Sequence, residues 1–149
     1  MHPVPRNIGW LVLFCILALY YTDSRADTWL DVTLTSYHFK REPKHNERNY
    51  GLGFEYDVED RWRLIGGFYK NSLWKTSVYA GASYSAWIEG PWRLSFAMGG
   101  ISGYAPGMIP IVVPALSYEG SRVGANLFVA PPYKESPGVA GLQVKLRFE

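Results

Sequence analysis

The chain has 149 residues and a formal charge of +2, and 16% of its residues are aromatic while only 19% are charged. This length suits one domain, and so apolar a composition excludes a long disordered tail. The nearly balanced charge gives no sign of a nucleic-acid partner.

The first 26 residues are predicted to be a secretory signal peptide. Arg6 provides a positive start, residues 8–21 form an apolar run, and Ser24-Arg25-Ala26 is a small-x-small cleavage site. An uncleaved anchor is the alternative, although the run is short for a membrane-spanning helix. The single cysteine lies in this segment, so the predicted mature chain, residues 27–149, has no disulfide and needs another source of rigidity, such as a closed sheet.

Eight segments of the mature chain are predicted to be β-strands, because their apolar residues fall on every second position. The pattern is clearest in the last one, where Leu142, Val144, Leu146 and Phe148 alternate with small or polar residues. No segment of the mature chain has helical periodicity. We expect strands at residues 28–39, 50–57, 61–70, 75–87, 91–103, 109–118, 122–130 and 139–148.

The connections between these strands differ in length at the two ends of the sheet. Tight turns are expected at residues 58–60, 89–90 and 119–121. The other connections, which are generally longer, are expected at residues 40–49, 71–74, 104–108 and 131–138. An even number of strands with this asymmetry is typical of outer-membrane proteins. The sequence therefore predicts an all-β fold, an eight-stranded antiparallel up-and-down transmembrane β-barrel in the outer membrane of a Gram-negative bacterium.

A soluble, lipocalin-like carrier in the periplasm is the alternative fold, because alternation does not tell which face points inward. The second face of the strands is rich in Gly, Ser and Ala, which fit the crowded interior of an eight-stranded barrel. This composition favours the membrane barrel.

The face predicted to point inward divides into two halves along the barrel. The half near the tight turns is charged, and it holds Asp31, Glu55, Asp57, Arg63, Arg93, Arg122, Lys145 and Arg147. The half near the longer loops is small or apolar, and it holds Tyr37, Gly51, Ile65, Gly67, Tyr79, Gly81, Ala97, Gly99 and Phe128. Charges inside a barrel are tolerated only when they are paired. We therefore expect ion pairs in the half near the tight turns. In the half near the longer loops, which we call the upper half, we expect a pocket for one acyl chain, or else tyrosine rings that simply fill the space.

Prolines at positions 110 and 114 interrupt the sixth predicted strand. Proline has no N–H to donate, so each leaves a missing hydrogen bond between neighbouring strands. With Pro131, which follows the seventh strand, Pro110 and Pro114 are candidates for lateral access of an acyl chain. The alternative is that they only shape the strand end.

The candidate chemistry lies at the loop end of the barrel. Topology brings His38, at the end of the first strand, and Ser72, in the loop after the third, to the same rim. A serine hydroxyl becomes a nucleophile when a histidine accepts its proton. The alternative is two solvated loop residues. The sequence contains no metal-binding cluster, phosphate-binding loop or nucleophile elbow.

Several motifs of the mature chain resemble the lipid A palmitoyltransferases of the outer membrane, the PagP family. These are Tyr37-His38, the run Asn46-Glu47-Arg48 followed by Gly51 and Gly53, the loop Gly67-Phe68-Tyr69-Lys70-Asn71-Ser72 with Ala80-Gly81, the run Pro110-Ile111-Val112-Val113-Pro114-Ala115-Leu116-Ser117, and the C-terminal Leu146-Arg147-Phe148.

The resemblance implies transfer of a palmitoyl chain from a phospholipid donor to lipid A, without a cofactor, by a protein that we expect to be a monomer. It implies that His38 is the general base and Ser72 its hydroxyl partner. Asn71 stands where the family has an aspartate, and an amide carries no negative charge to orient an imidazolium. Glu47, in a neighbouring loop, is a further carboxylate. The resemblance adds Ser83, where the family has a glycine that sets pocket depth, to the predicted substrate-binding residues Tyr37, Gly67, Tyr79, Gly81 and Gly99.

Two other functions are weighed against acyl transfer. One is a non-catalytic barrel of the same ancestry that binds lipid or strengthens the membrane, which Asn71 favours. The other is a lipid A deacylase, which uses a histidine near the C-terminus. No histidine follows His45, so the deacylase is disfavoured.

Overall fold

The computed structural model describes residues 26–40, 44–132 and 137–148. The predicted signal peptide lies outside the described residues, apart from Ala26. No helix of the described residues is long and apolar enough to cross a membrane. The described strands are β1 (Thr28–His38), β2 (Gly51–Asp57), β3 (Trp62–Lys70), β4 (Thr76–Glu89), β5 (Trp92–Ile101), β6 (Ile109–Glu119), β7 (Val123–Ala130) and β8 (Val139–Phe148).

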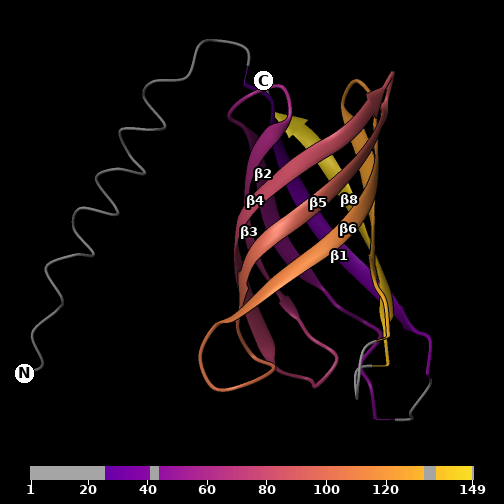
Figure 1. Ribbon diagram of the computed structural model, residues 1–149. Coiled ribbons are helices and arrows are strands. Elements are labelled where there is room, and N and C mark those ends of the chain that lie inside the picture. Colours follow the sequence, from indigo (N-terminus) through magenta and orange to yellow (C-terminus); the bar gives the residue numbers. More distant parts are fainter. Residues whose placement is uncertain (1–25, 41–43, 133–136, 149) are drawn as a thin grey trace, which may run out of the picture.

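These strands form one closed antiparallel barrel in which each strand pairs with the next in the chain. The barrel closes where β1 pairs with β8, from Thr28 opposite Phe148 to His38 opposite Val139. The strands run obliquely around the barrel, with the C-terminus at the end opposite the longer loops (Figure 1). The predicted eight-stranded up-and-down barrel is therefore confirmed.

The strand ends agree closely with the prediction. The largest differences are at the end of β4, which extends to Glu89 rather than residue 87, and at the end of β5, which stops at Ile101 rather than residue 103. The predicted tight turns are present. In the turn between β2 and β3, the Val58 N–H donates to the Trp62 carbonyl at 2.9 Å. At the turn between β4 and β5, Gly90 has a φ of 55°, a conformation that glycine adopts without strain.

The outer surface of the barrel is apolar while much of its interior is polar. Large hydrophobic side chains point outward from the middle of the strands and are exposed: Leu52, Phe54, Leu64, Phe68, Val78, Leu94, Phe96, Val112, Leu116, Leu127, Leu142 and Leu146. Buried polar side chains line the inside, among them Asp31, Glu55, Arg63, Ser85, Ser95, Asn126, Gln143 and Lys145. This is the arrangement of a barrel in lipid and the inverse of a soluble carrier, so it argues against the lipocalin-like alternative.

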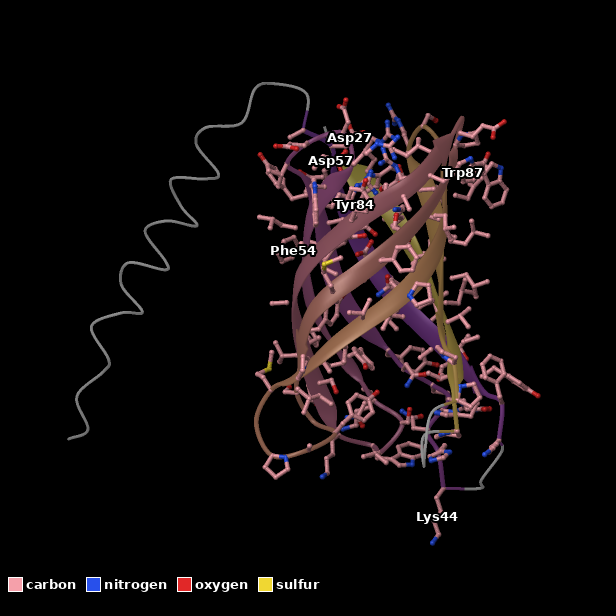
Figure 2. All side chains as sticks on the ribbon, viewed as in Figure 1. Asp27, Lys44, Phe54, Asp57, Tyr84 and Trp87 are labelled. Atoms are coloured by element: carbon pink, nitrogen blue, oxygen red, sulfur yellow. The ribbon has the colours of Figure 1, made fainter. Side chains whose placement is uncertain are left out.

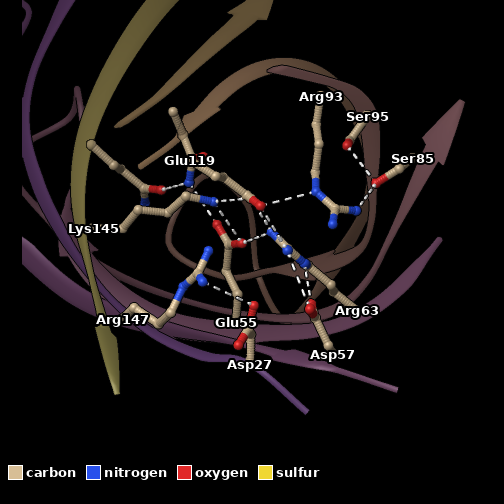
Figure 3. A network of polar contacts seen from close by, with 12 residues as sticks. Asp27, Glu55, Asp57, Arg63, Ser85, Arg93, Ser95, Glu119, Lys145 and Arg147 are labelled. Carbon is tan, nitrogen blue, oxygen red and sulfur yellow. Dashed lines mark hydrogen bonds and ion pairs between the residues drawn. The ribbon is translucent and has the colours of Figure 1, made fainter. Parts of the chain in front are cut away.

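The predicted charged half is a network of ion pairs at the tight-turn end (Figure 3). Arg63 is its centre and pairs with Glu55 at 2.8 Å, and also with Asp57 and Glu119. Lys145 is fully buried and bridges Glu55 at 3.0 Å and Glu119 at 2.7 Å. The remaining pairs join Arg93 to Glu119 and Arg147 to Asp27.

Two assignments in this half need correction. Arg122 was predicted to point inward, but it lies exposed in the turn before β7, one residue before the strand begins. Glu119 was predicted to lie in that turn, but β6 continues through it. Its carboxylate therefore points inward and accepts hydrogen bonds from Arg63, Arg93 and Lys145.

A further correction concerns Tyr37, which was predicted to line the upper interior. A β-bulge between Thr33 and Thr35 shifts the register of β1 against β8. A bulge inserts one residue and therefore reverses which side chains face inward beyond it. Tyr37 consequently points outward and is 49% exposed, and its ring packs edge-on against Phe39. The same shift turns His38 into the barrel rim.

Candidate functional site

The structure brings His38 and Ser72 into direct contact at the loop end of the barrel. His38 is the last residue of β1 and is 2% exposed, and Ser72 follows β3 in the short loop to β4. The Nε2 atom of His38 lies 2.9 Å from the Ser72 Oγ. The predicted proximity of these residues is thus observed at hydrogen-bonding distance, as serine activation by histidine requires.

The other side of the His38 ring faces a carboxylate. The Glu47 Oε1 lies 3.6 Å from His38 Nδ1 and also accepts a hydrogen bond from the His38 backbone N–H at 3.2 Å. His45 stacks on His38 with ring centroids 4.6 Å apart. A proton on Nδ1, facing Glu47, leaves Nε2 free to accept the Ser72 proton. The sequence named Glu47 but did not place it.

Asn71, the third predicted catalytic residue, organises its own loop. Its Nδ2 donates to the Ser77 hydroxyl and to the Gly103 carbonyl, at 3.0 and 3.2 Å. Its Oδ1 accepts from the backbone N–H groups of Leu73 and Lys75, at 2.9 and 3.0 Å. These four bonds use the full capacity of the amide. The side chain of Asn71 therefore shapes the loop that carries Ser72, and it is Glu47 that accompanies the histidine.

Two buried asparagines hold the loop of Glu47 against the loop of Ser72. Asn46 donates from its backbone N–H to the Ser72 carbonyl at 2.9 Å and from its side chain to the Asn71 carbonyl at 3.2 Å. Asn49 donates from its side chain to the Lys70 carbonyl at 2.8 Å. Sequence reasoning assigned no role to either side chain. The available signal was the pair of neutral amides that flanks Glu47 in a charged loop.

Tyrosine side chains occupy the upper interior of the barrel. A Cβ added to Gly53 would lie 2.2 Å from the Tyr79 hydroxyl, and one added to Gly67 would lie 2.8 Å from it. The ring of Tyr79 therefore packs directly over these two glycines. The Tyr69 and Tyr104 hydroxyls are 2.9 Å apart and connect β3 to the loop after β5. Two hollows of the described surface lie at the tight-turn end, one lined by residues 59–62 with Tyr84 and the other by Ser121, Arg122, Arg147 and Phe148.

The remaining predicted pocket residues lie on the walls between this region and the charged network. Gly81 of β4 is paired with Gly99 of β5, where the two backbones run in contact. Ser83 is paired with Arg63 on one side and Ala97 on the other. Ser83 therefore lies at the level where the charged network begins. Tyr37, as described above, is not part of this wall.

The candidate lateral opening corresponds to an interruption in the sheet. The pairing of β6 with β7 extends from Glu119 opposite Gly124 only to Ala115 opposite Phe128. Pro114 is the next residue of β6, and Pro110 lies near its start. By contrast, β6 pairs with β5 along its length from Ile109 to Tyr118. Pro131 is exposed and directly follows the end of β7.

Within the described residues no group of three or more His, Cys, Asp or Glu side chains is arranged to hold a metal ion.

No family model matches the sequence, and no curated protein matches it. Solved structures match it through their fold. The N-terminal β-barrel domain of Pseudomonas aeruginosa OprF is 15% identical with a TM-score of 0.55, covering 82% of this chain and 97% of that domain. The Yersinia pestis outer membrane protein Ail is 13% identical with a TM-score of 0.52, covering 83% of this chain and 100% of Ail. The chain thus has the eight-stranded fold of outer-membrane barrels, which supports the predicted location.

Proposed function

We propose that this protein is an outer-membrane acyltransferase that moves a fatty acyl chain from a phospholipid to lipid A. The single observation that carries the proposal is the contact of 2.9 Å between His38 Nε2 and Ser72 Oγ, with Glu47 at the opposite nitrogen of the same ring. The longer loops of outer-membrane barrels are extracellular, so we expect these groups to lie at the outer leaflet, where they would meet lipid A.

The geometry supports transfer in two balanced steps. In the first, Ser72 Oγ attacks the ester carbonyl carbon of the donor while its proton moves to His38 Nε2. The ester C–O bond breaks, and the lysophospholipid leaves as an alcohol with the proton from Nε2. In the second, a lipid A hydroxyl gives its proton to Nε2 and attacks the acylated serine, whose Oγ recovers that proton. Glu47 faces Nδ1 throughout and stabilises the imidazolium formed in each step.

The sheet supplies a route for the acyl chain. The stretch of β6 before Ala115 is paired with β5 but not with β7, and Pro110 and Pro114 have no N–H to extend the pairing with β7. An acyl chain from the lipid could pass there without breaking ladder hydrogen bonds. This feature supports a lipid substrate over a water-soluble one.

A second candidate function is a lipid-binding or structural barrel without catalysis. The specific observation in its favour is the packing of Tyr79 over Gly53 and Gly67, which fills space that an acyl chain would need. Acyl transfer therefore requires this ring to move aside when the donor binds. The non-catalytic barrel requires no such movement.

Lipid A mass spectrometry separates these functions. A host that lacks its own palmitoyltransferase would express the intact chain, Ser72→Ala, His38→Ala, or Ser121→Ala as a matched serine control in an exposed turn. We expect one added acyl mass with the intact chain and Ser121→Ala only. No added mass from an intact chain that is folded in the outer membrane would refute the acyltransferase, and a loss of acyl mass would indicate a deacylase.

A further inference from the structure

The loop end of the barrel carries a group of exposed cations around the His38–Ser72 site. We call this group the cationic rim, and it consists of Lys40, Lys44, Arg48, Lys70 and Lys75. Each lies within a few residues of a site residue: Lys40 follows His38, Arg48 follows Glu47, and Lys70 and Lys75 flank the loop of Ser72. Figure 2 shows Lys44 projecting beyond the loops, at the end opposite Asp27 and Asp57.

The cationic rim is not neutralised by the part of the chain that the structure describes. None of its five members forms an ion pair there, and the one carboxylate within these loops that is described, Glu47, is directed to His38. At the tight-turn end, by comparison, Arg63, Arg93, Lys145 and Arg147 all pair with carboxylates, and of the described cations there only the exposed Arg61 and Arg122 have no ion pair. Unpaired cations gathered at one site indicate an anionic partner rather than a structural role.

Among the described residues, the exposed cations of the loop end lie on one side of the barrel. The members of the cationic rim follow β1, precede β2, end β3 or precede β4, whereas the loop between β5 and β6, residues 102–108, has no charged residue. In the closed order of strands, the interrupted β6–β7 pairing lies on the opposite side. If the acyl donor uses that interruption, the cationic rim is free to serve the other substrate.

Exposed aromatic residues place the same loops at a membrane surface. Phe39, Tyr50 and Trp74 are all exposed and are interleaved with the cations, and Trp74 is anchored by its indole N–H to the Lys44 carbonyl at 3.0 Å. Amphipathic rings of this kind sit at the headgroup level of a bilayer. Cations at that level meet the phosphate groups of lipids.

We infer that the cationic rim binds the phosphate groups of the acceptor, a phosphorylated glycolipid of the outer leaflet, and holds its hydroxyl at Ser72. This inference rests on the proposed function, because it assigns the cationic rim to the acceptor of that reaction. It explains why the cations surround the His38–Ser72 contact and not the side of the barrel where the donor would reach it.

Binding to the full protein in nanodiscs tests the inference without turnover if Ser72→Ala is the background. The probes are bisphosphorylated lipid A, the same lipid A with its phosphates removed, and phosphatidylglycerol. The variants are Lys70→Gln with Lys75→Gln, and, as a matched control, Arg61→Gln with Arg122→Gln at the opposite end. Each exposed cation removed should weaken binding of the phosphorylated lipid about fivefold, so the variant that lacks both lysines should bind it about 25-fold more weakly.

We expect the control variant to bind phosphorylated lipid A like the parent. We expect the parent to bind dephosphorylated lipid A at least as weakly as the lysine variant binds the phosphorylated form, because three cations of the rim remain in that variant. Equal binding of both lipid A forms by the parent would overturn the inference, and this comparison needs no variant to fold. The inference would also be overturned if the control variant lost as much affinity for phosphorylated lipid A as the lysine variant does. Binding of phosphatidylglycerol by the parent with the same affinity as phosphorylated lipid A would overturn it as well. If acyl transfer occurs but phosphates do not matter, only this inference fails. If phosphates matter but no transfer occurs, the proposed function fails and the binding site stands.

Discussion

Glu47 and His38 form a contact between a loop carboxylate and the imidazole nitrogen that faces away from Ser72. The Oε1–Nδ1 distance is 3.6 Å, and the same oxygen accepts the His38 backbone N–H. This second bond fixes the carboxylate beside the ring whatever the protonation state of the histidine. The negative charge that Asn71 cannot provide is therefore present at the site, supplied by a different loop.

The first prediction concerns that charge. Glu47→Gln keeps an oxygen for the backbone N–H and removes only the charge, so we expect turnover to fall while KM for the donor is unchanged. Because Glu47 is partly exposed, the loss should be about two orders of magnitude, smaller than the roughly four orders that follow from the Asp→Asn change in a buried triad. Single-turnover acyl transfer measures this loss, and Glu47→Asp, which keeps the charge, is expected to be faster than Glu47→Gln. Glu59→Gln in a tight turn is the control, and an unchanged rate in Glu47→Gln would contradict this role.

Asn71→Asp is not expected to increase the proposed acyl transfer. The new carboxylate would face the Gly103 carbonyl oxygen, where the amide now donates at 3.2 Å. Losing this donor and setting two acceptors against each other should cost about 1–3 kcal/mol in the stability of the loop. Limited proteolysis of folded protein, compared with Asn71→Ala, measures the loop, and acyl transfer measures the site. Faster acyl transfer by Asn71→Asp than by the parent would show that a carboxylate at position 71, rather than Glu47, stabilises the protonated His38 ring.

The buried network is expected to be essential for folding rather than for chemistry. Lys145→Met would leave Glu55 and Glu119 without their bonds of 3.0 and 2.7 Å to the ammonium group. Removing one member of a buried ion pair costs about 3–5 kcal/mol, because the partner charge stays buried. Urea unfolding in lipid vesicles should show this loss, whereas Arg122→Met, on an exposed turn, should change little. If Lys145→Met were as stable as the parent protein, water would have to reach Glu55 and Glu119.

Sequence periodicity predicted the strands because alternation is a local property, and each strand needs only its own residues to show it. The position of Tyr37 could not be predicted in this way, since the bulge between Thr33 and Thr35 arises from pairing with β8. His38 and Ser72 were brought together by topology alone. The place of Glu47 depends on hydrogen bonds that Asn46 and Asn49 make to another loop, which no local pattern encodes.

Ser83 is predicted to limit the length of the transferred acyl chain. It lies on β4 opposite Arg63, where the uncharged upper interior meets the network. If the acyl chain occupies the upper interior, Ser83→Gly would add the volume of one hydroxymethyl group to that space, so we expect a preferred chain about one or two carbons longer. Ser83→Leu should shorten it. Product profiling by mass spectrometry with mixed-chain donors measures the preference, and identical profiles for all three proteins would remove Ser83 from the pocket floor.

The last prediction concerns the interruption between β6 and β7. Pro114 directly precedes the final pair, Ala115 opposite Phe128, and its ring nitrogen cannot donate to a neighbouring strand. Pro114→Val restores an N–H and suits a strand, so pairing should extend upward and the barrel should become more stable. If donor lipid passes through this interruption, the same change should slow acyl transfer from vesicles severalfold.

Substrate delivery must be separated from chemistry to interpret that result. Ser72 is partly exposed, so we expect a short-chain, water-soluble ester to reach it from solvent and to be hydrolysed at the parental rate in Pro114→Val. Val112→Ala, on the exposed outer face of the same strand, is the control and should leave both rates unchanged. Equal slowing of both substrates would place the effect of Pro114 on the site itself, and unslowed transfer from vesicles would show that the donor reaches Ser72 by another route.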